Sequence, residues 1–186
     1  MRSVDIDESD VEDIASLLER QIGYVVDFAV DVVRAVNLKG DEFVVDGEGG
    51  TPRTAFKNAR AAARFFVEER RRRRAGFDFE RTSTEIADRT DRRALSLEVE
   101  SAGQTMGPQD ASDLRRIASL LGRQIGYGIT LPGDLYVVNL ENGEFSVGTD
   151  EGDDEVVVAS PVSAAKLLLQ RRADLRLGFD VRNDQA

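Results

Sequence analysis

The sequence predicts an α+β protein built from two copies of one unit. One observation is an internal repeat: Ile14–Tyr24 reads IASLLERQIGY and Ile117–Tyr127 reads IASLLGRQIGY, so ten of eleven positions are identical at a spacing of 103 residues. The other is that each copy combines helical apolar spacing with short alternating segments joined by tight turns, which favours an antiparallel sheet with helices on one face. We expect a (β)αββα unit, with the two copies paired about a pseudo-two-fold axis as identical subunits are in a dimer. Two independent units lying side by side are the alternative.

The repeat also sets the expected division of the chain. Residues 1–78 hold the first copy, residues 79–108 connect the copies, and residues 109–186 hold the second copy. In the connecting segment, the run from Leu95 to Val99 alternates apolar and polar residues, which is the period of a strand. Val4 and Ile6 are expected to form a matching strand ahead of the first copy.

Each copy is predicted to begin with an amphipathic helix. Ser9 followed by Glu12 fits a capping box, which places the start of the first helix at Ser9. Apolar residues then recur every three or four positions and line one helix face, and Gly23 suits the residue just after the helix end. The expected buried positions are Ile14, Leu17 and Leu18 in copy one, and Ile117, Leu120 and Leu121 in copy two.

A hairpin is expected next. Residues 28–38 alternate in polarity as a half-buried strand does, and Val36–Leu38 matches Val138–Leu140 at an offset of 102 residues. Gly40-Asp41 suits a type II′ turn and Asn142-Gly143 suits a type I′ turn. Two different turn sequences therefore preserve a two-residue connection.

The copies diverge before their last helix. In copy one, Thr51-Pro52 is predicted to cap and begin this helix. In copy two, a strand at residues 156–159 is expected first, and Ser160-Pro161 then begins the helix. A strand in copy two thus replaces two helical turns of copy one in this interpretation. Phe66 and Leu168 fall at matching places in the two helices, and both are expected to be buried.

Composition limits the environment. The net charge is −10, lysine is rare beside arginine, and no apolar run approaches the length of a membrane span. This composition resembles that of cytoplasmic proteins from extreme halophiles, so we expect a cytoplasmic protein whose stability rises with salt. An ordinary acidic protein from a GC-rich genome is the alternative.

Composition also limits the chemistry. The absence of cysteine and histidine removes disulfides, thiolates, the commonest general base, the Ser-His and Cys-His nucleophile pairs and the usual zinc ligands. No glycine motif for nucleotide binding occurs. We therefore expect a protein that is not an enzyme and that needs neither a cofactor nor a metal ion.

Two loops nevertheless remain as candidate ion sites. The acidic loop Asp150–Glu155 carries oxygen ligands suited to Ca²⁺ or Mg²⁺, although it lacks the EF-hand spacing. The loop Gly47–Gly50 is expected to lead into a helix N-terminus, where free N–H groups can hold an anion. Asp46 and Glu48 would repel that anion. A solvated acidic loop and a plain linker loop are the favoured interpretations.

The third candidate site is the arginine run Arg70, Arg71, Arg72, Arg73 and Arg74. Basic clusters of this kind contact nucleic-acid phosphates. The favoured interpretation is a helix C-terminus, where cations complement the helix dipole. Copy two breaks the run, and high salt weakens phosphate binding steeply.

The sequence thus predicts a non-catalytic binding protein, an intramolecular pseudo-dimer with an unknown protein partner in a salt-rich cytoplasm. A DNA- or RNA-binding regulator that uses Arg70–Arg74 is the first alternative. An enzyme dependent on a divalent metal held by Asp150–Glu155 is the second.

Overall fold

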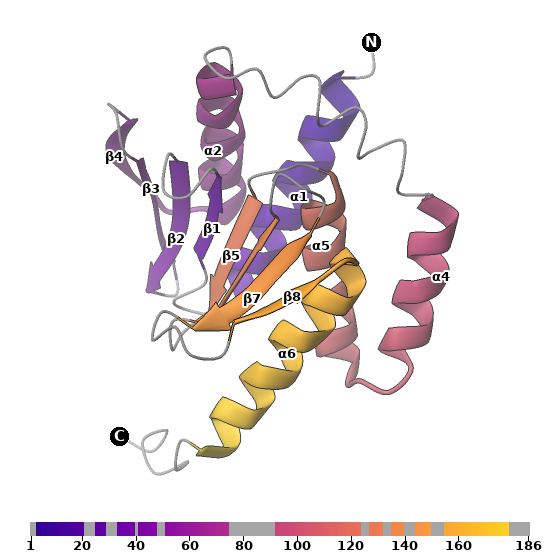
Figure 1. Ribbon diagram of the computed structural model, residues 1–186. Coiled ribbons are helices and arrows are strands. Elements are labelled where there is room, and N and C mark those ends of the chain that lie inside the picture. Colours follow the sequence, from indigo (N-terminus) through magenta and orange to yellow (C-terminus); the bar gives the residue numbers. More distant parts are fainter. Residues whose placement is uncertain are drawn as a thin grey trace.

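The computed structural model describes residues 3–20, 25–28, 33–39, 41–47, 51–74, 92–123, 127–131, 135–139, 144–149 and 155–178. Within these residues the chain forms five helices and one antiparallel sheet of eight strands (Figure 1). The helices lie on one face of the sheet. The predicted α+β class is therefore confirmed.

The first half of the molecule, as we call the elements from α1 to α2, places four strands between two helices. In chain order, the six elements of this half are α1 (Ser3–Arg20), β1 (Val25–Phe28), β2 (Val33–Lys39), β3 (Glu42–Gly47), β4 (Thr51–Phe56) and α2 (Ala59–Arg74).

The second half, from α5 to α6, follows the same order of elements, and an additional helix, α4, precedes it. The elements are α4 (Arg92–Gly103), α5 (Pro108–Arg123), β5 (Tyr127–Leu131), β6 (Leu135–Asn139), β7 (Phe145–Thr149), β8 (Val156–Val158) and α6 (Pro161–Gly178).

The two halves share one sheet. Its strand order is β4-β3-β2-β1-β5-β6-β7-β8, and β1 pairs with β5 at the centre, with Val26 opposite Ile129. On the helical face, α2 contacts α1, α1 contacts α5, and α5 contacts α6. The alternative of two independent units is therefore wrong.

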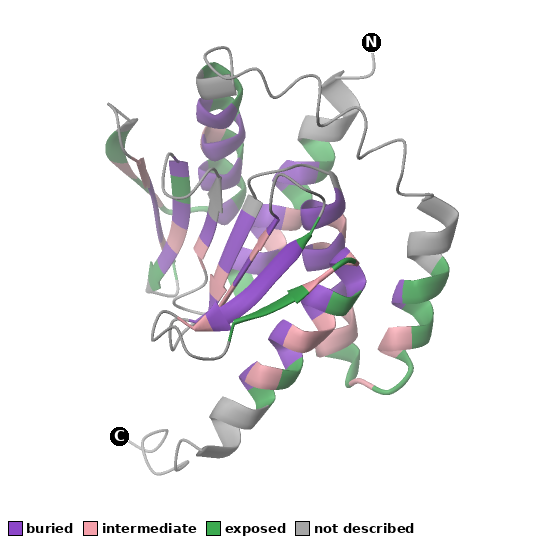
Figure 2. Cartoon of the chain, in the orientation of Figure 1, coloured by how far each residue is buried: buried purple, intermediate pink, exposed green. Residues whose placement is uncertain are grey.

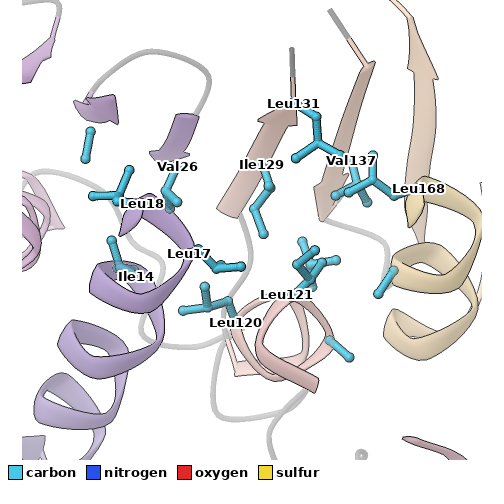
Figure 3. Close-up of a cluster of buried hydrophobic side chains, with 14 of the residues drawn as sticks. Ile14, Leu17, Leu18, Val26, Leu120, Leu121, Ile129, Leu131, Val137 and Leu168 are labelled. Atoms are coloured by element: carbon cyan, nitrogen blue, oxygen red, sulfur yellow. The ribbon is translucent and has the colours of Figure 1, made fainter. Parts of the chain in front are cut away.

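The hydrophobic core lies between the sheet and these helices. The residues predicted to be buried from their helical spacing are fully buried: Ile14, Leu17, Leu18, Phe66, Ile117, Leu120, Leu121 and Leu168. Figure 3 shows Leu17 of α1 and Leu120 of α5 next to each other between the two helices, close to Val26 and Ile129. The core is therefore continuous across the junction of the halves.

The first helix is longer than predicted. Because α1 begins at Ser3, Val4 and Ile6 belong to this helix, so the predicted strand ahead of copy one is wrong. Ser9 lies inside α1 and is exposed, so the predicted helix start at Ser9 is also wrong.

The strand predicted from Leu95 to Val99 is also wrong, because this segment is part of α4. An alternation of three apolar residues is too short to exclude a helix. Val99 and Ala102 are three residues apart, as one face of a helix requires, and both pack against the core, as does Met106 after the end of α4. Leu97 is 60% exposed. The contacts of α4 with α5 and α6 therefore decide its structure.

The last helix of the first half begins later than predicted. Thr51-Pro52 belongs to β4, an edge strand that can accept a proline because one side of it makes no ladder. Asn58 caps α2 instead, since its Oδ1 accepts the Ala61 N–H at 3.1 Å. In α6 the predicted cap is confirmed: Ser160 Oγ accepts the Ser163 N–H at 3.3 Å, and Pro161 is the first helical residue.

The predicted (β)αββα unit therefore requires correction, because each half contains four strands. Copy one does not replace a strand by helical turns. Residues 28–38, predicted as a single strand, contain the end of β1 and most of β2. β5 was not predicted at all.

The predicted turns are tested only in part. Lys39 pairs with Glu42, which leaves the two-residue connection expected at Gly40-Asp41. α6 ends at Gly178, as expected. Gly23, Gly76 and Asn142-Gly143 lie outside the described residues.

Candidate functional site

A buried ion pair links the two helices of the first half. Asp10 of α1 and Arg70 of α2 are 0% and 1% exposed, and Arg70 Nη1 donates a hydrogen bond to Asp10 Oδ2. A lone charge at such a depth would be strongly destabilising, whereas a paired and hydrogen-bonded one is tolerated. The pair therefore fixes how α1 and α2 lie against each other.

The second half contains the matching pair. Asp113 of α5 and Arg172 of α6 are 1% and 8% exposed, and Arg172 Nη1 lies 3.2 Å from Asp113 Oδ2. Arg172 also donates to Asp110. Asp10 and Asp113 are 103 residues apart, and Arg70 and Arg172 are 102 apart, which are the offsets of the sequence repeat.

A further arginine crosses between the halves at this place. Arg20, at the end of α1, donates from Nε to Asp113 Oδ1 at 2.9 Å. Asp113 is thus held by one arginine of its own half and one of the other half. These interactions tie the orientation of the first half to that of the second.

Buried asparagines occupy a second pair of matching positions. Asn37 of β2 donates from Nδ2 to the Leu18 carbonyl at 2.7 Å, and Asn139 of β6 donates to the Leu121 carbonyl at 2.5 Å. Each carbonyl lies in the last turn of its helix, where backbone oxygens lack helical partners. The asparagines therefore join the ends of α1 and α5 to the sheet.

Sequence reasoning did not identify these buried polar residues. A signal for the aspartates is present in the sequence, because Ser9-Asp10 recurs as Ser112-Asp113, in each case with three residues between the aspartate and the start of the repeat. Asn37 and Asn139 also match at an offset of 102 residues, but the sequence alone indicates only that both lie in strands. Nothing in the local sequence indicates that Asp10 pairs with an arginine 60 residues away.

The arginine run is divided between the core and the surface. Arg70 is buried against Asp10, while Arg71 and Arg72 are exposed, and Arg72 Nη1 lies 2.8 Å from Glu69 Oε1. Arg73 and Arg74 end α2, and their side chains lie outside the described part of the chain. A nucleic acid could therefore not contact Arg70 without disrupting the buried ion pair between Arg70 of α2 and Asp10 of α1.

The two candidate ion loops gain no support. Residues 150–154 of the acidic loop lie outside the described residues, and Glu155 accepts a hydrogen bond from Ser146 Oγ. Gly47–Gly50 leads into β4 and not into a helix, so the expected helix N-terminus for an anion is absent there. Across the described ranges, no group of three His, Cys, Asp or Glu residues is arranged to hold a metal ion.

The face of the sheet away from the helices is a separate surface. Side chains alternate between the two faces of a strand, so the neighbours of the core residues Val26, Ala35 and Val45 point to this open face. Successive strand pairings join these neighbours into one row that crosses seven strands without a charged residue: Ala55, Val44, Val36, Val25, Thr130, Tyr136 and Gly148.

The row is closely packed where it reaches the second half. A Cβ atom at Gly148 would lie 3.0 Å from Tyr136 Oη, so the tyrosine occupies the space above this glycine. A neighbouring row of the second half adds Val138, Ser146 and Val157. In the first half the corresponding row is charged, with Arg34 Nε 2.5 Å from Asp46 Oδ1. The open face thus carries an uncharged, mostly half-buried row from the first half into the second. Beyond this row, the Glu155 carboxylate lies on the same face and accepts a hydrogen bond from Ser146 Oγ.

Charged residues instead gather on the outer surface of α1 and α2. Arg60 contacts Glu8 and Glu12 at 2.6 Å each, and Arg64 contacts Glu8 at 3.2 Å. The hydrogen bonds to Glu8 and Glu12 raise the pKa of Arg60 above its ordinary value. Arg60 is a permanent cation in any case, so this surface cannot act as an acid or base through that residue.

No helix in the described ranges combines the length and apolar character needed to cross a bilayer. The chain matches no protein-family model, and comparison with curated proteins and with solved structures returns no significant match.

Proposed function

We propose that the chain is a non-catalytic binding protein, built as an intramolecular pseudo-dimer, that holds a protein partner on the open face of its sheet. The observation that carries the proposal is the uncharged row from Ala55 to Gly148. About a third of the residues in this chain are charged (32%), so an uncharged surface of this extent is unexpected on a solvent-facing sheet. Uncharged surface of this kind is typical of a contact that is covered in a complex.

Three matches support the pseudo-dimer. From the centre of the sheet outward, the strands of each half follow in chain order: β1, β2, β3 and β4 on one side, and β5, β6, β7 and β8 on the other. The central pair is Val26 and Ile129, which are themselves 103 residues apart, so each residue faces its own equivalent. The buried Asp–Arg pairs and the asparagine contacts recur at the same offsets. A duplicated unit paired edge to edge about a pseudo-two-fold axis accounts for all three.

The ionisable groups of the core favour binding over catalysis. They form two separate ion pairs between helices, Asp10 with Arg70 and Asp113 with Arg172. Buried charges with a structural role are paired in this way. The four residues also lie on the helical side of the sheet, away from the open face. The proposed role of these groups is to hold the scaffold rigid.

The acidic composition supports a salt-rich cytoplasm as the setting. Salt screens contacts between exposed charges, whereas it strengthens the burial of apolar surface when the ions are excluded from the protein. An uncharged sheet face therefore suits a partner better in such a cell than the arginine run does. Burial of Arg70 further weakens the nucleic-acid alternative.

The proposal can be tested by affinity capture from an extract of the source cells in molar KCl. Val36 and Val138 are half-buried and match each other at an offset of 102 residues. Val36→Lys and Val138→Lys should each lose a stoichiometric protein partner that the parent retains. Ala61→Lys, an equal change of charge on the exposed surface of α2, should retain it. A partner that survives both sheet substitutions would disprove the proposed surface.

A further inference from the structure

The two edges of the sheet differ in how they meet solvent. β4 presents Pro52, which cannot donate a ladder hydrogen bond, and the exposed Arg53. Both are features that prevent an edge from pairing with another strand. β8 contains only valine, and Val156 and Val157 are 39% and 49% exposed although their side chains lie on opposite faces. Figure 2 shows β8 as an exposed strand at the margin of a largely buried sheet.

Another exposed apolar residue belongs to the same end of the molecule. Ser160, two residues after β8, donates from Oγ to Glu98 Oε1 of α4 at 2.8 Å. The residue next to Glu98 is Leu97, which is 60% exposed. Among the described residues, three of the four exposed large hydrophobic side chains therefore lie on β8 and α4.

We propose that β8 is a self-association edge, which pairs antiparallel with β8 of a second copy of this chain and is centred on Val157. An antiparallel pair centred on one residue is self-complementary, as a two-fold contact between identical chains requires. The sheet already contains one such junction, because β1 meets β5 with Val26 opposite Ile129. Pairing through β8 would extend the same sheet by the same kind of contact.

The charges near β8 suit a second copy. When Val157 lies opposite its own counterpart, Glu155 lies opposite Ala159 of the other copy, one residue before the Ser160 cap of α6. A carboxylate near a helix N-terminus is stabilising. The first turn of α6 has no acidic residue of its own, although its cap residue Ser160 already donates to Glu98 of the same chain. Each copy would place Glu155, which also accepts a hydrogen bond from Ser146 Oγ of its own chain, near the other's helix.

The strength of the contact should depend on salt. β8 has three residues, so the shared ladder is short, and two chains of charge −10 repel each other at low ionic strength. Screening at molar salt removes most of this repulsion. We therefore expect a reversible dimer that is favoured by high salt. Val157 belongs to both the edge and the open face, but self-association is measured with this chain alone, so this inference does not rest on the partner proposed above.

The test is sedimentation of the full chain over a range of concentrations in low and molar KCl. The parent should shift toward twice its mass with concentration in molar KCl. Val157→Lys should remain a monomer under all these conditions. Ala55→Lys is the matched control, because Ala55 lies at the other edge, is exposed, and corresponds to Val157 at an offset of 102 residues. It should associate as the parent does.

A second variant keeps the test decisive if Val157→Lys folds poorly. The chain has no cysteine, so Val157→Cys introduces a single thiol. Facing residues of an antiparallel pair have Cβ atoms about 4.5–5.5 Å apart, close to disulfide reach. A mild oxidant should cross-link Val157→Cys into a covalent dimer and leave Ala55→Cys largely as a monomer. A parent that stays monomeric in molar KCl, or equal cross-linking of the two cysteine variants, would overturn the proposal.

Discussion

The two halves solve the same packing problem with different outer surfaces. In the first half, the outer side of α1 and α2 carries the ion pairs of Arg60 with Glu8 and Glu12. In the second half, the position that matches Arg60 is Val162, which is 1% exposed. There α4 lies against α5 and α6 and buries Val99.

The difference shows which features the common scaffold requires. The buried Asp–Arg pair, the asparagine contact and the apolar core recur in both halves. The outer surface can be completed either by solvated charges or by an added helix. Features present in only one half, such as α4 and the valine edge β8, are therefore the better candidates for a specific role.

The largest effect should come from breaking the buried pairs. Arg70→Met leaves Asp10 buried without its arginine and should reduce the free energy of unfolding by about 3–5 kcal/mol. Arg172→Met should cost less, because Asp113 retains Arg20 at 2.9 Å. Urea unfolding at one fixed salt concentration measures both. If Arg172→Met were the more damaging change, the assigned role of Arg20 between the halves would be wrong.

Truncation of matched core leucines should show whether the halves are equivalent. Leu18 and Leu121 are both 0% exposed, and replacing either by alanine should cost about 2–5 kcal/mol. The two losses should agree closely in urea unfolding experiments. Leu97→Ala is the control, since a residue that is 60% exposed should change stability by about 0.5 kcal/mol or less. Very different losses at Leu18 and Leu121 would contradict the equivalence of the two cores.

The outer surfaces should respond differently to salt. Val99→Ala removes apolar contacts of α4 and should cost about 1–2 kcal/mol at any salt concentration, from roughly 0.8 kcal/mol for each carbon group lost. Arg60→Gln should have a smaller effect that fades as KCl is added, because exposed ion pairs are screened. Melting temperatures of both variants in low and molar KCl provide the comparison. A salt-dependent loss for Val99→Ala would indicate that α4 is held mainly by charge.

The whole chain should become more stable as salt rises. At about 0.1 M salt the Debye length is about 10 Å, and at 1 M it is about 3 Å, so repulsion within a protein of charge −10 weakens over this range. The melting temperature should increase with KCl. A value that stays flat or decreases would remove the inference of a salt-rich environment.

The smallest effect should come from the surface part of the arginine run. Replacing Arg71 and Arg72 by glutamine should change the free energy of unfolding by about 0–1 kcal/mol for each residue. We also expect no nucleic-acid complex in about 0.2 M KCl for the parent, so the variant has none to lose. A tight complex with DNA or RNA that depends on these arginines would favour the regulator over the binding protein.

Local patterns in the sequence determined much of the scaffold. The apolar positions from Ile14 to Leu18 and from Ile117 to Leu121 were predictable because helical spacing places them on one face, whatever that face contacts. The Ser160-Pro161 start of α6 was predictable because a cap acts on the next turn of its own chain. The repeat indicated that the two halves begin with equivalent helices, whereas the strand predicted only for copy two is present in both halves, each of which has four strands between two helices.

Tertiary structure decided the features that depend on distant partners. The central strands β1 and β5 are four and five residues long, too short for a clear pattern, and they are defined by pairing with each other. Leu97 and Val99 lie in a helix because α4 has α5 and α6 to pack on. Arg70 appears in the sequence as one of five similar arginines. Only the fold distinguishes it, because a buried guanidinium requires a carboxylate within hydrogen-bonding distance, and Asp10 reaches it from another helix.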